Sequence, residues 1–189
     1  KMIMESRRGV LYAGGGVTHS NSADELFELA ELTHLPVTTT LMALGTFPSR
    51  HPLSLGMLGM HGSYGTNTAI CNCDLLVNIG ARFDDRVTGR TDGFARKARK
   101  IHFDIDPSEI NKNISVDLAV VGNAKEALRA LITELQQQNH QPAPLERQDW
   151  LAQISAWHRE NPLSYDKSSG LLKPQHVIES LSNAAPGDT

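Results

Sequence analysis

Cysteine is scarce in this sequence: the 189 residues contain only 2, Cys71 and Cys73. So little cysteine excludes a disulfide scaffold and favours a reducing compartment. The Cys-Asn-Cys spacing is too short for the usual zinc site, and no second pair of Cys or His completes four ligands. We therefore expect no metal site within this chain, and a cytoplasmic location.

Positive charge and long apolar runs are lacking as well. The sequence has 18 Lys and Arg against 21 Asp and Glu, for a formal net charge of -3, whereas nucleic-acid-binding domains are usually basic. No apolar run approaches the roughly 18 residues that a membrane helix needs. We therefore expect neither nucleic acid nor a membrane as a partner.

Familiar catalytic motifs are missing too. The sequence has no nucleophile elbow, no H-E-x-x-H, no P-loop and no clearly spaced acid–base pair. It starts at Lys1 rather than at Met and shows no signal peptide. We interpret the chain as a piece of a longer protein, which limits what it is expected to do alone.

What the sequence does contain is a regular alternation of strand and helix signals over residues 1–138. Ser22 and Glu25 fit a capping box at the start of one helix, and Asn123 is placed to cap another. Such alternation predicts a parallel sheet covered on both faces. The fold class we expect is α/β, with a doubly wound, mostly parallel, Rossmann-like sheet and a helical C-terminal extension. The expected strands are residues 9–13, 35–40, 75–79, 101–105 and 118–121.

The character of the sequence changes after residue 138, where a polar stretch rich in glutamine and proline begins. Trp150, Ile154 and Trp157 then recur at helical spacing, and their apolar face needs either this domain or a missing neighbour to pack on. Pro174 predicts the first turn of one more helix. We expect an α/β domain at residues 1–138, a linker with a short amphipathic helix at 139–173, and the start of a further domain at 174–189.

In an open parallel sheet, ligands bind beyond the carboxyl ends of the strands. The glycine turn at residues 14–16 would let the backbone approach an anion there. It is not a nicotinamide fingerprint, because His19 stands where that pattern needs Gly or Ala, and the acid expected about 20 residues later is absent. The turn alone is weak evidence, since a tight turn also explains it.

Two further loops at this edge carry chemistry. Residues 82–86 hold two arginines and two aspartates, and the forked guanidinium groups suit phosphates and carboxylates. The alternative is a solvated ion-pair loop, which stabilises little. Asp104 ends a strand where it could hold a ribose or an adenine edge, while Asp106 could equally cap a helix before Pro107.

The most unusual stretch is residues 56–62, with three glycines, two methionines and a histidine. Its soft, polarizable surface suits a flat aromatic ring better than a metal, since no acid or cysteine is nearby. Taken together, the loops predict an extended nucleotide with a flat head group, such as a flavin dinucleotide.

These motifs, at residues 12–16, 56–62, 80–89 and 102–106, occur in the same order and spacing in the acetohydroxyacid synthase (acetolactate synthase) family. The chain resembles the central domain of the catalytic subunit over about residues 1–138, and its last segment resembles the start of the C-terminal domain. The resemblance implies a carboligase dependent on thiamine diphosphate and Mg²⁺. Such an enzyme decarboxylates pyruvate and joins the two-carbon unit to pyruvate or 2-oxobutyrate, the first common step toward the branched-chain amino acids.

In this family the central domain holds FAD, which does no net redox work, while thiamine diphosphate and Mg²⁺ are held by the two other domains. The resemblance therefore implies that this chain alone is inactive and that the full subunit forms a homo-oligomer with a small regulatory subunit. It places Met60, Asp85 and Arg86 where the active site meets this domain, with Arg86 holding the carboxylate of the second oxoacid. At Asn123 the family often has Asp. The implied FAD-binding residues are Gly14, Gly15, Gly16, Thr40, Leu41, Leu58, Gly59, Met60, His61, Gly80, Ala81, Arg82, Asp84, Arg86, Val87, Asp104, Ile105 and Asn123.

Three alternatives remain at this point. Central domains of other thiamine-diphosphate carboligases and decarboxylases share the fold, although the 82–86 loop argues against them. A non-catalytic NAD(P)-binding module is the second, and its sirtuin-like form would need a zinc-binding cysteine quartet that this sequence lacks. An interaction domain with an incidental glycine turn is the third, and it leaves the 82–86 loop unexplained.

Overall fold

A computed structural model describes residues 1–138, 144–168 and 170–185. At its centre lies a six-stranded sheet of order β3-β2-β1-β4-β5-β6, and every neighbouring pair is parallel. The predicted doubly wound α/β fold is confirmed, and the sheet is parallel throughout. The strands are β1 (Gly9–Ala13), β2 (Val37–Thr39), β3 (Ser54–Met57), β4 (Leu75–Ile79), β5 (Arg99–Asp104) and β6 (Leu118–Val121).

The strand order reverses between β1 and β4, the two central strands. Every residue of both strands is buried, as expected where helices cover both faces of a parallel sheet. From this point the chain winds outward through β2 and β3 on one side and through β5 and β6 on the other. The reversal opens a crevice at the carboxyl ends of β1 and β4, which is where such folds bind ligands.

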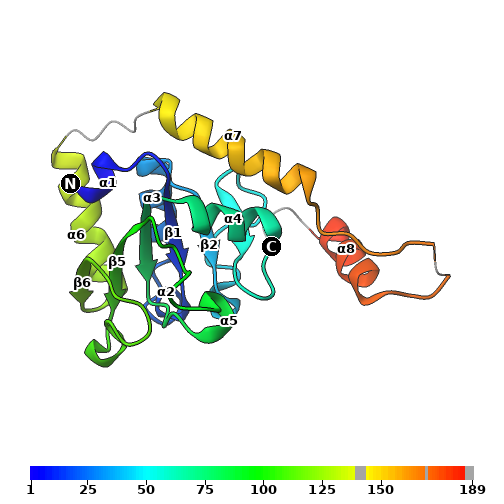
Figure 1. Cartoon of the computed structure of the whole chain (residues 1–189), viewed down its shortest axis with the longest axis horizontal. Helices are drawn as coiled ribbons and strands as arrows, with labels where there is room; N and C mark the ends of the chain where they lie inside the picture. The colour runs from blue at the N-terminus through cyan, green and yellow to red at the C-terminus, as the bar shows by residue number, and fades with distance from the viewer. Residues whose placement is uncertain (139–143, 169, 186–189) are drawn as a thin grey trace.

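The helices lie on both faces of the sheet (Figure 1). α3 and α6 pack against one another on one face, and α4 packs against α7. The α-helices are α1 (Met2–Glu5), α2 (Gly15–His19), α3 (Ala23–Thr33), α4 (Tyr64–Asn72), α5 (Asp85–Thr88), α6 (Ala124–Gln137), α7 (Pro144–Glu160) and α8 (Pro174–Ala184), and the 3₁₀ helices are η1 (Leu41–Ala43) and η2 (Pro107–Glu109).

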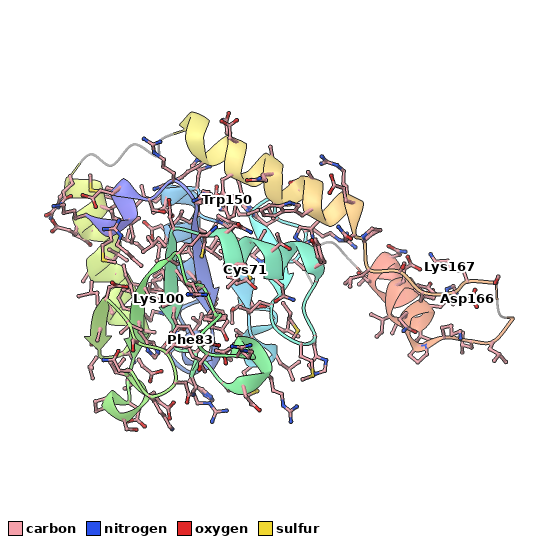
Figure 2. All side chains as sticks on the ribbon, viewed as in Figure 1. Cys71, Phe83, Lys100, Trp150, Asp166 and Lys167 are labelled. Atoms are coloured by element: carbon pink, nitrogen blue, oxygen red, sulfur yellow. The ribbon has the colours of Figure 1, made fainter. Side chains whose placement is uncertain are left out.

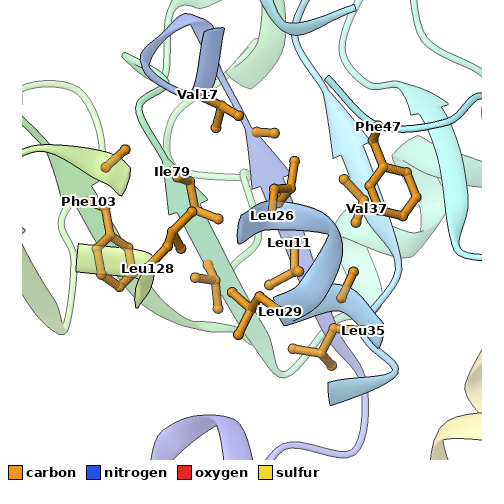
Figure 3. Packing of buried hydrophobic residues seen from close by; sticks show 14 of the residues in the cluster. Leu11, Val17, Leu26, Leu29, Leu35, Val37, Phe47, Ile79, Phe103 and Leu128 are labelled. Atoms are coloured by element: carbon orange, nitrogen blue, oxygen red, sulfur yellow. The ribbon is translucent and has the colours of Figure 1, made fainter. Parts of the chain in front are cut away.

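Two apolar clusters hold the layers together. Successive residues of a strand point to opposite faces, so Leu11 joins the cluster under α3 and α6 while Val10 joins the cluster on the other face. Figure 3 shows the first cluster, in which Leu26, Leu29 and Leu128 close over the sheet and are fully buried. Each such leucine contributes about 1.5–3 kcal/mol through the apolar surface it removes from water.

The amphipathic helix predicted around Trp150 is α7, which packs on this domain through α4. Trp150 and Ile154 are buried in the second cluster, and the indole nitrogen of Trp150 donates to the carbonyl of Gly9, 3.3 Å away. Figure 2 places Trp150 beneath α7 at one end of the strands and Phe83 toward the other. The tryptophan face therefore finds its apolar surface within this chain.

A buried arginine anchors the start of α7. The Arg147 guanidinium donates to the carbonyls of Ile3, Ser6 and Thr33, with Nη2 lying 2.6 Å from the Ile3 oxygen. Burial lowers the pKa of Arg147. Three backbone carbonyls satisfy this cation, so α7 ties the ends of α1 and α3 together.

Two local expectations need correction. Ser22 precedes α3, but its hydroxyl makes no cap hydrogen bond and lies 2.8 Å from the Ser20 hydroxyl. Glu25 turns away from the helix start because its carboxylate pairs with Arg129 of α6 at 2.9 Å. The expected strands did not include residues 54–57, yet the first two residues of the glycine-rich stretch, Gly56 and Met57, complete the edge strand β3.

The chain beyond α7 has a different character. α8 begins at the predicted proline, stands apart from the sheet (Figure 1) and exposes Ile178 and Leu181. Arg50 Nη2 donates to the Ser182 carbonyl at 2.8 Å. The division at residues 138 and 173 stays a prediction.

Candidate functional site

A cavity of about 590 Å³ opens at the carboxyl ends of the strands. Its walls come from the residues that follow β1, β2, β4, β5 and β6, so it covers the β1–β4 reversal. A volume of this size is typical of sites that hold cofactors and other small molecules. Of the predicted FAD-binding residues, those that line this cavity are Gly15, Gly16, Thr40, Gly80, Ala81, Arg82, Asp84, Asp104, Ile105 and Asn123.

The remaining predicted residues lie outside the cavity lining. Most of them belong to two segments, residues 57–62 and 84–88, which we call the loop pair. The backbone N–H of Met60 donates to the carbonyl of Arg86 at 2.8 Å, which joins the two segments. The predicted residues that do not line the cavity are Gly14, Leu41, Leu58, Gly59, Met60, His61, Asp85, Arg86 and Val87.

The glycine turn is explained first by packing. A Cβ on Gly16 would lie 2.6 Å from the Gly80 Cα, and one on Gly14 would overlap the Gly80 carbonyl. The turns after β1 and β4 are thus in backbone-to-backbone contact, which requires glycine on both sides. Gly15 has more room, since its Cβ would meet the Met42 Cβ at 3.3 Å. Ligand approach therefore concerns Gly15 and Gly16, which line the cavity.

Two buried polar atoms in the lining residues have no hydrogen-bond partner in the part of the chain that the structure describes. They are Oγ1 of Thr40 and Oδ1 of Asp84. A buried polar atom without a partner costs about 1–3 kcal/mol, so such atoms are usually paired. A ligand carrying hydroxyl or N–H donors fits this part of the cavity.

Asp104 is held from two directions at the end of β5. Its Oδ1 accepts from the backbone N–H of Asp106 at 3.0 Å, and its Oδ2 lies 3.5 Å from Nε2 of the fully buried His102. Burial lowers the pKa of His102, and the neighbouring Asp104 carboxylate opposes that effect. The Asp106 carboxylate accepts from Ser108 N at 2.8 Å and caps η2. Both carboxylates line the cavity, but Asp106 caps a helix, whereas Asp104 is oriented by its neighbours at the end of β5.

Asn123 has two roles that the sequence suggested separately. Its Oδ1 accepts from the Lys125 N–H at 2.9 Å and caps α6, and the residue also lines the cavity beside Ala124. The α6 N-terminus therefore faces the cavity.

The loop after β4 is only partly explained by ion pairing. Arg82 lies 3.9 Å from the Asp84 carboxylate, and its side chain is 70% exposed. Phe83, between them, has φ of +52° and is buried against Tyr12 and His102. Burial raises the pKa of the Tyr12 hydroxyl, and Asp84 adds to that effect. The buried Phe83 fixes the loop while its charged neighbours face the cavity.

Several lining residues were not predicted. Most are direct neighbours of predicted ones along the chain, and a helical turn brings His19 and Ser20 to the same wall. The lining residues that are not among the implied FAD-binding residues are Tyr12, His19, Ser20, Met42, Phe103, Asp106, Glu109, Gly122 and Ala124. Only their position at strand ends could have indicated them.

Large apolar side chains are exposed around this edge of the sheet. Met42 is 65% exposed and Met60 64%, with Leu41, Tyr64 and Ile105 also exposed. Scattered exposed apolar residues are common, but these gather on the elements that frame the cavity and the loop pair. They offer an apolar surface for a flat ring or for a neighbouring part of a longer protein.

The chain is similar to known proteins over its whole length. The family described as "Thiamine pyrophosphate enzyme, central domain" matches residues 1–131. The chain belongs to this family. Within the thiamine pyrophosphate enzyme central-domain family, similar proteins include the acetolactate synthase large subunit of Cyanidium caldarium, 46% identical over 185 residues, which covers 98% of this chain and 32% of that protein.

Two other proteins named as acetolactate synthases are similar to nearly the whole chain. The acetolactate synthase of Mycobacterium bovis is 47% identical over 189 residues, covering 100% of this chain and 30% of the relative. The probable acetolactate synthase large subunit of Methanocaldococcus jannaschii is 45% identical over 184 residues, covering 96% and 30%. This thiamine pyrophosphate enzyme central domain thus spans about a third of the length of its relatives.

The part of the chain that the structure describes has neither a metal-ligating cluster nor a helix suited to a membrane. Within residues 1–138, 144–168 and 170–185, no group of three or more His, Cys, Asp and Glu could hold a metal ion. None of the helices in those ranges is long and apolar enough to cross a membrane. Cys71 is exposed, whereas Cys73 is buried, and burial raises the pKa of its thiol to about 12.

Proposed function

We propose that this chain is the FAD-binding central domain of an acetolactate synthase large subunit. The observation that carries the proposal is that relatives bearing that name align with 96–100% of the chain at 45–47% identity. The alternative assignments of the sequence, to another thiamine-diphosphate enzyme or to an NAD(P)-binding module, have no comparable support.

FAD fits the donor set of the cavity. The turn at Gly15 and Gly16 leaves room for a diphosphate, and the Arg82 guanidinium can meet its charge. Asp104 can accept hydrogen bonds from ribose hydroxyls or an adenine amine, while Asn123 offers a neutral amide beside it. The unpartnered oxygens of Thr40 and Asp84 would receive donors from the bound molecule.

The loop pair is proposed to serve the active site of the full subunit. Thiamine diphosphate, with Mg²⁺, supplies the carbon–carbon chemistry in this family, and its ligands lie outside this chain. Arg86 would hold the carboxylate of the second oxoacid, a role that suits its forked guanidinium. Met60 and Asp85 would border the same space, with Met60 presenting its thioether to a flat ring.

The full subunit is proposed to decarboxylate pyruvate and to join the two-carbon unit to pyruvate or 2-oxobutyrate. We propose that it works in the cytoplasm as a homo-oligomer with a small regulatory subunit. The exposed apolar rim around Leu41, Met42 and Met60 would then be covered by neighbouring domains.

Calorimetric titration of the purified chain with FAD, NAD and NADP tests the proposal. We expect binding of FAD and no comparable binding of NAD or NADP. Tight binding of NAD or NADP without FAD would contradict the proposal in favour of a nicotinamide module. The chain alone, given pyruvate, thiamine diphosphate and Mg²⁺, is expected to form no acetolactate.

A further inference from the structure

One side chain outside all the predicted sites holds the loop pair. Asn67 lies on α4, and its amide pairs with both sides of one peptide segment: Gly59 N–H donates to Oδ1 at 2.8 Å, and Nδ2 donates to the Gly59 carbonyl at 3.0 Å. Both amide atoms are used, so only one orientation of the amide satisfies the pair. The Asn67 amide thus satisfies both the N–H and the carbonyl of Gly59, as the backbone of a neighbouring strand would.

Gly59 is also the point where the two segments touch. Its φ is +84°, and a Cβ there would overlap the Arg86 carbonyl and lie 2.8 Å from the Val87 Cα. The next residue, Met60, donates its backbone N–H to that same carbonyl at 2.8 Å. Fixing the Gly59 peptide therefore also fixes where Met60 meets Arg86.

The helix that carries Asn67 is itself firmly placed. The Ser63 hydroxyl caps α4 by accepting from Thr66 N at 3.2 Å, and the Thr66 hydroxyl donates to the Leu55 carbonyl of β3 at 2.5 Å. On its other side, Gly65 packs against the His158 ring of α7. Asn67 can therefore transmit the position of a rigid element to an otherwise exposed loop.

We infer that Asn67 is a positioning residue that holds Met60 against Arg86, and thereby orders the part of the site intended for the flavin ring and the second oxoacid. The role toward the flavin ring and the second oxoacid rests on the function proposed above, whereas the ordering of the loop pair does not. Among the residues that the structure describes, the Asn67 side chain makes no hydrogen bond to a residue that lines the cavity, so we expect its effect to be confined to the loop pair.

The test uses the whole chain and three variants. Asn67→Ala removes both hydrogen bonds, and Asn67→Asp keeps the acceptor for Gly59 N–H but loses the donor. Asn72→Ala is the matched control, because Asn72 lies on the same helix and its side-chain amide donates to the Thr68 carbonyl of that helix at 2.9 Å, away from the loop pair. Amide hydrogen exchange is followed at Gly59 and Met60, and the affinities for FAD and for ADP are measured by calorimetry.

We expect exchange at the Gly59 and Met60 amides to rise about tenfold or more in Asn67→Ala, less in Asn67→Asp, and not at all in Asn72→Ala. FAD should bind several-fold more weakly to Asn67→Ala, while ADP, which lacks the flavin ring, should bind as before. A merely structural role would weaken both ligands together.

Unchanged exchange at both amides in a folded Asn67→Ala chain would overturn the inference, as would equal losses of FAD and ADP affinity. If Asn67→Ala does not fold, Asn67→Asp decides by the same measurements. If the unmodified chain binds no FAD, the proposed function fails for this chain, and the exchange measurement alone decides whether Asn67 orders the loop pair.

Discussion

The cavity and the loop pair lie at the same edge of the sheet but are built differently. The cavity rests on backbone packed against backbone, with Gly16 and Gly80 in direct contact and Asp104 held by its neighbours. The loop pair is more exposed: the bond from Met60 N–H to the Arg86 carbonyl joins its two segments, and the Asn67 amide holds Gly59 through two further hydrogen bonds. The cavity is therefore formed within this chain, whereas the loop pair is ordered by one side chain and leaves Met60 exposed for something else to cover.

The largest expected effect breaks the cavity. Gly80 has φ of +65°, and a Cβ there would lie 2.5 Å from the Gly16 Cα, whereas Gly89, with φ of +54°, has nothing within 4 Å. Both alanine variants carry the cost of a positive φ, about 1–3 kcal/mol, and Gly89, with ψ of -123°, lies outside the left-handed helical region. Gly80→Ala adds backbone overlap, so we expect it to lower the free energy of unfolding by about 4 kcal/mol or more.

Urea unfolding of the two glycine variants measures this difference. Gly89→Ala is the control, because it isolates the backbone conformation from the close approach. Equal losses of stability in both variants would show that the contact between the two turns contributes nothing, and the cavity would then be no more rigid than the loop pair.

The next effect separates the two regions by ligand. Asp104→Ala removes an ionised acceptor from the cavity and should weaken both FAD and ADP about tenfold to a hundredfold. Met60→Ala should weaken FAD alone, by about two- to tenfold, since it removes a thioether contact with a flat ring. Calorimetric titration of both ligands checks this. Loss of ADP binding in Met60→Ala would contradict the separation.

A smaller effect concerns pH, because His102 is buried beneath the cavity and His158 is half-buried near the loop pair. Burial lowers the pKa of His102, beneath the cavity, and of His158, which packs on α4 near the loop pair. Below about pH 6.5 the unfolded chain takes up protons that the folded chain does not, so stability falls as pH drops through the unfolded pKa toward the folded one. We therefore expect the free energy of unfolding to fall between pH 7 and pH 5.

Variants of the two histidines show how much of this loss of stability each one causes. His102 is fully buried, so His102→Phe should remove most of the slope of the unfolding free energy between pH 7 and 5, and His158→Gln a smaller part. The folded pKa of His102 sets the slope, which cannot exceed about 1.4 kcal/mol per pH unit for one group. A His102→Phe slope equal to that of the unmodified chain would contradict the assignment.

The sequence predicted the cavity better than the loop pair, for a physical reason. Strands β1, β4, β5 and β6 follow from short apolar runs, and Asn123 follows from its place before a helix. Because ligands of such sheets bind at strand ends, the turns after those strands could be named in advance. These features depend on local sequence and on one rule of topology.

What the sequence could not predict depends on partners far along the chain. Glu25 fits a capping box but pairs with Arg129, which the fold brings beside it. Arg147 reads as an ordinary charged residue of a helix, yet it is buried among three carbonyls. Asn67 has no motif of its own, and only the folded chain places it against Gly59.

The smallest expected effect tests whether the Arg82 guanidinium at the cavity binds the ligand or is only an exposed surface charge. Arg82 lines the cavity and Arg90 does not, yet both side chains are largely exposed, at 70% and 88%, and each lies near an aspartate. Exposed ion pairs contribute little, so Arg82→Ala should weaken FAD by about two- to fivefold, and Arg90→Ala should leave it unchanged. Calorimetry at low and high salt measures both, and the Arg82 effect should shrink with salt because exposed charges are screened. Equal affinities in the two variants would place the diphosphate on the glycine turn alone. An Arg82 effect that persists at high salt would instead mean that the bound cofactor excludes water from the guanidinium, and that the cavity closes further around its ligand than the free chain does.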